Sequence, residues 1–298
     1  MANVEHLTKL KQGLRSWQKW RSVNDSIDLD LTNANLSGLE IQAASLTKAN
    51  LAKADLSNTE LIAADLAAAN LEQAELINAC LSDANLSNSI LYQAYLIDAD
   101  LTNANLIGAD LREADCQRAN FSHANLIGTS MRKANLSKAN LMGAKLHRTN
   151  LSEADLTEAH GNEADFSQAN LYDTEILGFF GYQANFYQAK ANFSHFCKAY
   201  LHQANFVEAQ LKQADLRWTN LSAANLSYSN LEKAQLRGAN LTNADLKYAN
   251  LVCANLEGAN LTKADLRGAN LTGANIKYAI FNRAKLQGTI MPDGSKHS

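Results

Sequence analysis

The sequence contains a single proline, Pro292, so none interrupts residues 1–291. Proline lacks the amide N–H that a β ladder requires, and its absence suits a backbone that pairs along its whole length. No run of about eighteen apolar residues occurs, so we expect no membrane-spanning helix. Lys9, Lys11 and Arg15 fall where a signal peptide has its apolar segment, so we expect no signal peptide either.

An excess of charge of either sign is also missing. The chain has 27 basic and 30 acidic residues, a formal net charge of −3. This near-neutrality argues against a nucleic-acid binder, which needs a basic stripe, and against a strongly acidic mimic of DNA. The four cysteines, Cys80, Cys116, Cys197 and Cys253, lack the spacing of metal ligands. We expect free thiols and a cytoplasmic location.

A five-residue repeat dominates the chain, as in Leu241–Thr272, which reads LTNAD LKYAN LVCAN LEGAN LTKAD LRGAN LT. On an α-helix, five residues advance by about 500°, so the leucines would form no stripe. On a continuous strand, an odd period sends successive leucines to opposite faces. The chain must therefore turn once per repeat. With right-angled turns, four repeats close a coil of about twenty residues, and coils stack about 4.8 Å apart.

The repeat keeps one register from Leu31 to Met291, without insertion or deletion. Of the 52 central positions from Leu36 onward, 37 are leucine, and 41 of the 52 small positions two residues earlier are alanine. We expect both to point inward, because a narrow coil requires small side chains beside large ones. The register predicts about thirteen coils and a rod about 60 Å long.

The repeat resembles the consensus A-(D/N)-L-x-x of the pentapeptide-repeat family. The resemblance implies an all-β solenoid, a right-handed quadrilateral β-helix, with the central Leu or Phe and the preceding Ala inside. The runs LKQGLRSWQKWR, from Leu10, and MPDGS, from Met291, are similar to the ends of cyanobacterial members, which include a regulator of heterocyst differentiation. The resemblance therefore implies a cyanobacterial source and a regulatory role.

Both ends differ from the repeat. Over residues 3–23, apolar residues at three- and four-residue steps predict one amphipathic helix with Asn3 as N-cap. We expect residues 1–24 to form a helical cap that covers the exposed edge of the first coil of the β-helix, residues 25–291. The alternative is an amphipathic membrane anchor. Pro292 and Asp293-Gly294 end the repeat before a tail, residues 292–298. Because both ends look closed, we expect a monomer.

Residues 160–200 depart most from the consensus. Gly161 and Gly181 replace inward leucines of neighbouring coils, and Phe179 replaces a small residue, so we expect a bulge or irregular coil there. Ala191-Asn192-Phe193 also fits a locally shifted repeat. Contiguous exposed aromatic residues mark binding sites, which predicts a partner-binding patch. Its residues are His160, Phe180, Tyr182, Tyr200 and His202. The alternative is that Phe179 and Phe180 turn inward above the glycines.

Signs of catalysis are weak. Carboxylates recur only as letters of the repeat, the seven histidines show no HxxxH spacing, and no glycine-rich phosphate loop occurs. We therefore expect no catalytic, cofactor-binding or metal-binding residues, and a non-enzymatic module that binds an unidentified protein, not nucleic acid or membrane. The resemblance leaves two alternatives, a DNA-mimicking topoisomerase (gyrase) binder and a purely structural rod. A gyrase supercoiling assay unaffected by excess protein would exclude the first.

Overall fold

The computed structural model describes residues 2–298, so Met1, the first residue of the expected cap, lies outside the described residues. The chain divides into two compact units, Met1–Asn150 and Leu151–Ser298. Among residues 2–298, no helix is both long enough and apolar enough to cross a membrane.

One tight turn recurs in every pentapeptide. In the first repeat, the Ala34 amide N–H donates to the Leu31 carbonyl oxygen at 3.0 Å, and Asn33 between them has a φ of 57°. Every fifth residue from Asn33 to Gly288 has a positive φ of this kind. Non-glycine residues pay about 1–2 kcal/mol for this left-handed conformation. The turn must therefore be held by the bonds that each coil makes with the next.

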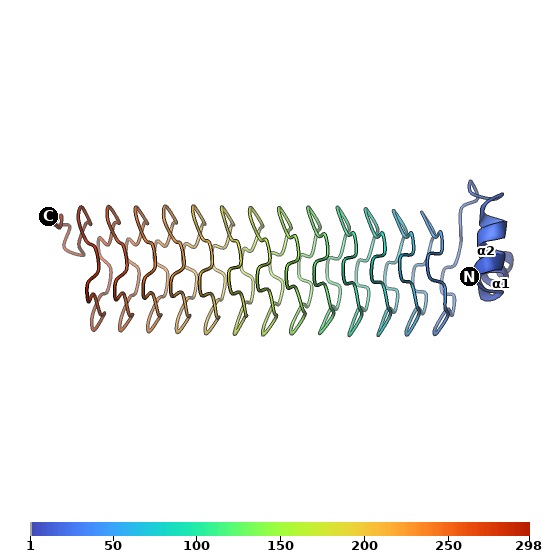
Figure 1. Cartoon of the computed structure of the whole chain (residues 1–298), viewed down its shortest axis with the longest axis horizontal. Coiled ribbons are helices and arrows are strands. Elements are labelled where there is room, and N and C mark those ends of the chain that lie inside the picture. The colour runs from blue at the N-terminus through green and yellow to red at the C-terminus, as the bar shows by residue number, and fades with distance from the viewer. Residues whose placement is uncertain (1) are drawn as a thin grey trace. The chain divides into compact units, whose positions relative to one another are not determined.

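Those bonds join residues one coil apart. The Leu31 amide N–H donates to the Asn50 carbonyl oxygen at 2.8 Å, and Asp55 donates back to Ala34 at 2.9 Å. Parallel bridges join residues twenty apart, from Asp30–Asn50 to Ser130–Asn150 in the first unit and from Asp155–Glu175 to Asn270–Ile290 in the second. Four pentapeptides therefore make one coil, and Figure 1 shows this coil repeated within each unit.

The inside of each coil is apolar and fully enclosed. The central leucines and the preceding alanines are almost all less than 2% exposed. Where threonine replaces the alanine, its hydroxyl donates to a carbonyl oxygen of the previous coil, as Thr219 Oγ1 does to Phe196 at 2.9 Å. The expectation that central and small positions point inward is confirmed.

The N-terminal segment forms two helices, α1 (Val4–Lys11) and α2 (Leu14–Arg21). The expectation of one helix over residues 3–23 is wrong, because Gly13 has a φ of 93°, outside the helical range. The Asn3 N-cap is confirmed, since its side chain accepts from the amide N–H groups of Glu5 and His6.

The N-terminal helical segment forms hydrogen bonds with the first coil. These bonds take the place of those that later coils form with the coil before them. The Asn3 amide N–H donates to the Asp30 carbonyl at 2.9 Å, and the Asp30 amide donates to His6 Nδ1 at 3.1 Å. Trp17 Nε1 donates to the Ser45 carbonyl at 3.1 Å, and the Trp17 side chain is fully buried. Figure 1 shows both helices beside this coil.

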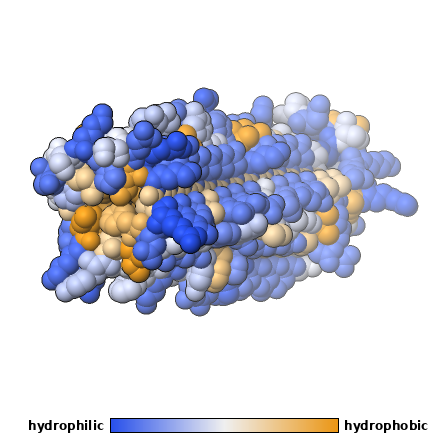
Figure 2. All heavy atoms as spheres, turned by 60° about the vertical axis from the view of Figure 1, so that its left-hand side comes forward, coloured by the Kyte–Doolittle hydropathy of each residue, from blue (hydrophilic) through white to orange (hydrophobic). Residues whose placement is uncertain are grey.

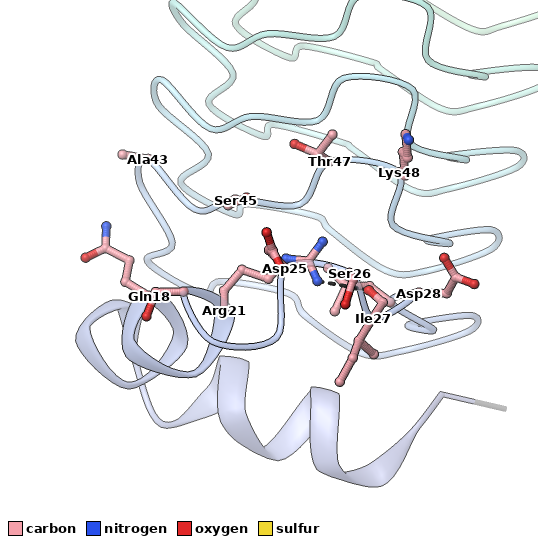
Figure 3. A pocket seen from close by; sticks show the side chains of 12 residues that line it. Gln18, Arg21, Asp25, Ser26, Ile27, Asp28, Ala43, Ser45, Thr47 and Lys48 are labelled. Atoms are coloured by element: carbon pink, nitrogen blue, oxygen red, sulfur yellow. Dashed lines mark hydrogen bonds between the residues drawn. The ribbon is translucent and has the colours of Figure 1, made fainter.

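A crevice lies between α2 and residues 43–48 (Figure 3). Arg21 reaches across it from α2, and its Nη1 donates to the carbonyl oxygens of Asn24 at 2.7 Å and Ile27 at 2.9 Å. These bonds fix the chain between α2 and the first coil, and Figure 3 shows the Arg21 side chain directed toward Asp25, Ser26 and Ile27.

The coils of residues 160–200 are regular, so the expected bulge is wrong. The bridges His160–Phe180 and Phe180–Tyr200 keep the twenty-residue spacing. Ala191 stays inward at 0% exposure, and Phe193 takes the outward turn position with a φ of 64°, so the repeat is not shifted there. The volume changes are absorbed by side chains without change of the backbone.

The C-terminal residues fold back as a hairpin on one side of the last coil. Ile290 and Lys296 form an antiparallel bridge, and the Gly288 amide donates to the His297 carbonyl at 2.8 Å. The other sides stay open, since Ile276, Phe281 and Leu286 are partly exposed. The expectation that this end is closed is therefore met only in part. The monomer stays a prediction, and the C-terminal end no longer supports it.

Candidate partner-binding surface

Most outward positions before a central residue carry Asn or Asp, for a clear structural reason. Asp165 Oδ1 accepts the amide N–H of Ser167 at 3.0 Å, and Asn185 does the same for Tyr187 at 3.2 Å. Asn185 Nδ2 also donates to Asp165 Oδ1 in the previous coil at 2.9 Å. Each such side chain therefore closes its own turn and joins two coils, and an aromatic residue that replaces it can form neither bond.

His160, Phe180 and Tyr200, here called the aromatic column, occupy that position in three successive coils. Their rings stack: the centroids of His160 and Phe180 are 4.7 Å apart at an interplanar angle of 8°, and those of Phe180 and Tyr200 are 5.0 Å apart at 3°. The coil spacing sets this distance. Phe180 is 36% exposed and Tyr200 is 54% exposed. The column therefore presents stacked rings to solvent.

A second stacked pair lies two residues further along each coil. The ring centroids of Tyr182 and His202 are 5.8 Å apart at 13°, and Tyr182 is 42% exposed. His202 Nδ1 lies 2.8 Å from Ser222 Oγ. The aromatic column and this pair, together called the aromatic patch, are the five residues selected from the sequence. The structure brings all five together on neighbouring columns of one unit.

The core beneath the patch explains the two glycines. Phe179 turns inward and is fully buried, as the alternative interpretation expected, whereas Phe180 stays at the surface. A Cβ added at Gly161 would lie 2.3 Å from the Phe179 ring, and one added at Gly181 would lie 2.6 Å from it. One phenylalanine therefore fills the space of two central side chains. Phe166, Phe186 and Phe206 stack beside it at 4.9 and 4.6 Å.

Two asparagines near the patch have roles that the sequence did not suggest. Because Phe180 cannot accept the Tyr182 amide N–H, Asn162 of the previous coil accepts it at 2.9 Å. Asn192 accepts the Lys212 amide at 3.0 Å in the same way, where Gln210 replaces the usual Asn. The signal was an Asn two residues after a position that lacks Asn or Asp.

Other exposed aromatic residues also went unselected. Tyr228 and Tyr248 stack at 5.1 Å, and each is more than half exposed. Trp218 is 57% exposed, and its ring covers Gly238, where an added Cβ would lie 2.3 Å away. The missed signal is an aromatic residue followed twenty residues later by glycine, as in Trp218–Gly238 and Tyr248–Gly268. These residues provide matched controls for the aromatic patch.

Charged groups form local pairs. Arg217 and Arg267 each bind, in bidentate fashion, the aspartate two residues earlier, at 2.6 and 2.8 Å. The hydrogen bonds from Arg267 hold the pKa of the Asp265 carboxyl below its usual value.

Burial raises the pKa of the Cys116 thiol, which lies inside the coil. Within residues 2–298, no three His, Cys, Asp or Glu side chains gather in a way that could hold a metal ion.

These features define a β-helical solenoid with a stacked aromatic surface. The family model for pentapeptide repeats matches the chain eight times, at residues 27–61, 44–83, 79–115, 114–152, 139–176, 182–217, 219–252 and 249–288. The chain belongs to the pentapeptide repeat family. It is a right-handed β-helix of pentapeptide repeats, preceded by two short helices.

Solved structures include related chains. HetL of the cyanobacterium Nostoc sp. strain PCC 7120, involved in heterocyst differentiation regulation, is 32% identical over 94% of this chain and 98% of its own, with a TM-score of 0.38. A trypsin-treated form of QnrB1, a plasmid-mediated fluoroquinolone resistance protein, is 20% identical over 67% of this chain and 88% of its own, with a TM-score of 0.29. Rfr23 of the cyanobacterium Cyanothece 51142 is 25% identical over 52% and 86%, with a TM-score of 0.13. No curated protein sequence matches the chain significantly.

Proposed function

We propose that this chain is a non-enzymatic, cytoplasmic interaction module with a regulatory role, and that it binds a partner protein through the aromatic patch. Membership of the pentapeptide repeat family and the likeness to HetL, a protein involved in regulation, support the class of function. The four free cysteines support a reducing compartment. The exposed, stacked rings of the aromatic patch support the site.

The main support for this site is that exposed aromatic rings replace side chains that would form hydrogen bonds with the backbone. At the aromatic column, three successive coils lack the Asn or Asp that closes the turn in most other repeats, and the His202 amide N–H has no partner within residues 2–298. A hydrogen bond of this kind contributes about 0.5–1.5 kcal/mol, and the stacked rings recover a similar amount. Stability alone therefore does not favour these rings over asparagine, whereas partner contact would.

The ends have roles in this proposal. Residues 1–24 serve as a cap on a β-helix of about thirteen coils, residues 25–291, and residues 292–298 are a tail. The bonds from Asn3, His6 and Trp17 to the first coil support the cap, because they satisfy groups that an open β edge would leave unpaired. The cap would prevent end-to-end growth at that end.

The test is affinity capture with a variant that removes the exposed rings. The variant carries Phe180→Asn, Tyr182→Ser and Tyr200→Asn, and its matched control carries Tyr228→Ser and Tyr248→Ser. Circular dichroism first establishes that both remain folded. We expect a protein that binds the wild type and the control but is lost from the patch variant. A partner retained equally by all three would contradict the proposed site, and no specific partner would favour a structural rod.

A further inference from the structure

The last coil differs from every coil before it in the second unit because its edge is not paired. In the preceding coil, the amide N–H groups of Leu261 and Leu266 donate to the carbonyl oxygens of Ile280 and Lys285, both at 2.8 Å. Within residues 2–298, the amide N–H groups of Ile276, Phe281 and Leu286 have no hydrogen-bond partner. These donors of a β ladder are therefore left open on adjacent sides of the coil.

The same coil exposes apolar side chains. The central residues of the preceding coil, Leu256, Leu261 and Leu266, are 0% exposed, whereas Ile276, Phe281 and Leu286 are partly exposed. Ile280 is 44% exposed and Tyr278 is 74% exposed at the rim. Figure 2, in which this end comes forward, shows an apolar area surrounded by hydrophilic atoms. We call this surface the end face.

The rim of the end face is positively charged. From Ala274 to Ser298, the chain has four basic residues, Lys277, Arg283, Lys285 and Lys296, and one acidic residue, Asp293. Lys285 Nζ lies 3.8 Å from Asp265 Oδ2, and Lys277 Nζ lies 4.9 Å from the centroid of the Tyr278 ring. This part of the chain therefore carries a net positive charge within a protein that is slightly acidic.

The tail shows that this coil accepts an added strand. On one side, residues 295–297 run antiparallel to residues 288–290, with the His297 amide donating to the Thr289 carbonyl at 2.8 Å. Within residues 2–298, the sides centred on Ile276 and Phe281 carry no such strand. An extended peptide can pair with a free β edge through its backbone and place its side chains in adjacent pockets.

We propose that the end face binds an extended, acidic segment of a partner protein, with alternating apolar and carboxylate side chains. Its carbonyl groups accept the open N–H donors, its apolar side chains cover Ile276 and Phe281, and its carboxylates face the basic rim. A second copy of this chain is a poorer occupant, because two identical end faces would bring like charges together. This surface is separate from the aromatic patch.

The test measures hydrogen exchange of the full chain with blocked synthetic peptides at millimolar concentration. One peptide alternates valine and glutamate, and the other alternates valine and lysine. We expect the acidic peptide to slow exchange of the amides in residues 274–286, with an apparent affinity at least about tenfold tighter than that of the basic peptide. Amides of the aromatic patch should not change.

Two charge-reversed variants sharpen the test. In Lys277→Glu/Arg283→Glu/Lys285→Glu the peptide preference should invert, whereas in the control Lys190→Glu/Lys198→Glu/Lys233→Glu it should stay. The proposal is overturned if neither peptide protects residues 274–286, or if both protect them equally. It is also overturned if sedimentation shows a dimer that buries these amides, since a second copy would then be the occupant.

Discussion

Two regions of the second unit, residues 221–271 and residues 156–206, differ in how far changes in the core and at the surface are compensated. In the first region, leucine fills the core and Asn or Asp bonds the coils together, as Asn240 does with Asn220 at 3.2 Å. In the second, the volume lost at both central glycines is refilled, since the Phe179 ring lies against Gly161 and Gly181. The lost surface bonds are replaced only in part, by Asn162. The core is therefore compensated at the two glycines, whereas the surface bonds beneath the aromatic patch are replaced only in part, which agrees with the partner-binding role that we propose for it.

The largest effect is expected from Phe179→Ala. It removes a fully buried ring that fills the space of two central side chains, so the free energy of unfolding should fall by about 3–5 kcal/mol. Adding Gly161→Leu and Gly181→Leu should recover most of that loss, because the triple variant restores the consensus core. Thermal unfolding of both variants is the measurement. A triple variant no more stable than Phe179→Ala would show that the two regions do not share one packing rule.

Gly238→Ala, in residues 221–271, should cause the next largest loss of stability. The added Cβ would lie 2.3 Å from the Trp218 ring, which must move, at a cost of about 1–3 kcal/mol. Gly258→Ala is the matched control, since it has the same positive φ and no atom within 4 Å of the added Cβ. A smaller drop in melting temperature is expected for the control. Equal drops would mean that backbone strain, and not the covering ring, requires glycine.

Tyr200→Asn separates stability from binding. It removes the stack on Phe180 but allows the His202 amide N–H to be accepted, so the free energy of unfolding should change by less than about 1 kcal/mol. Binding of the captured partner should weaken markedly. A melting curve measures the change in stability, and a titration with the captured partner measures the change in binding. A large loss of stability would indicate that the aromatic column is a structural device.

The smallest effect concerns pH. Because Arg267 depresses the pKa of Asp265, their pairing stabilises the fold above the unfolded-state pKa of about 4 and is lost as pH falls through the lower folded pKa. Asp265→Asn keeps a side-chain oxygen for the Arg267 amide but lacks the charge. At pH 7 its melting temperature should be lower by about a degree, since the Arg267 side chain is 45% exposed and solvent screens the pair. The difference should shrink as pH falls below about 4 and vanish once pH is below the lowered folded-state pKa of Asp265. A difference that persists in acid would exclude the ion pair as its cause.

Much of the fold followed from the spacing of residues. The five-residue period required a turn, and the run from Leu31 to Met291 kept one register, because each coil copies the backbone of the last. That Phe179 turns inward above the glycines was foreseen as an alternative interpretation. The break at Gly13 was not, since an isolated glycine within an apolar periodicity is compatible with a helix.

The errors had two causes. The bulge over residues 160–200 was inferred from missing central side chains, but Phe179 supplies that volume from a neighbouring position and the backbone stays regular. The closed C-terminal end was inferred from Pro292 and Gly294, which do end the repeat, yet the hairpin covers one side only. The five residues of the patch, four exposed and one half-buried, could be selected from the sequence. Contact with a partner stays a prediction, because exposure alone does not name what covers a surface.

Photo-cross-linking from the centre of the aromatic patch tests the central claim most directly. The photoreactive analogue p-benzoylphenylalanine replaces Phe180 in one protein and Tyr248 in the other, both exposed members of stacked columns. Each is irradiated in lysate of the parent organism. The account predicts a discrete adduct with one protein from position 180 and none from position 248. Adducts of the same protein from both positions, or from position 248 alone, would contradict a partner site on the aromatic patch.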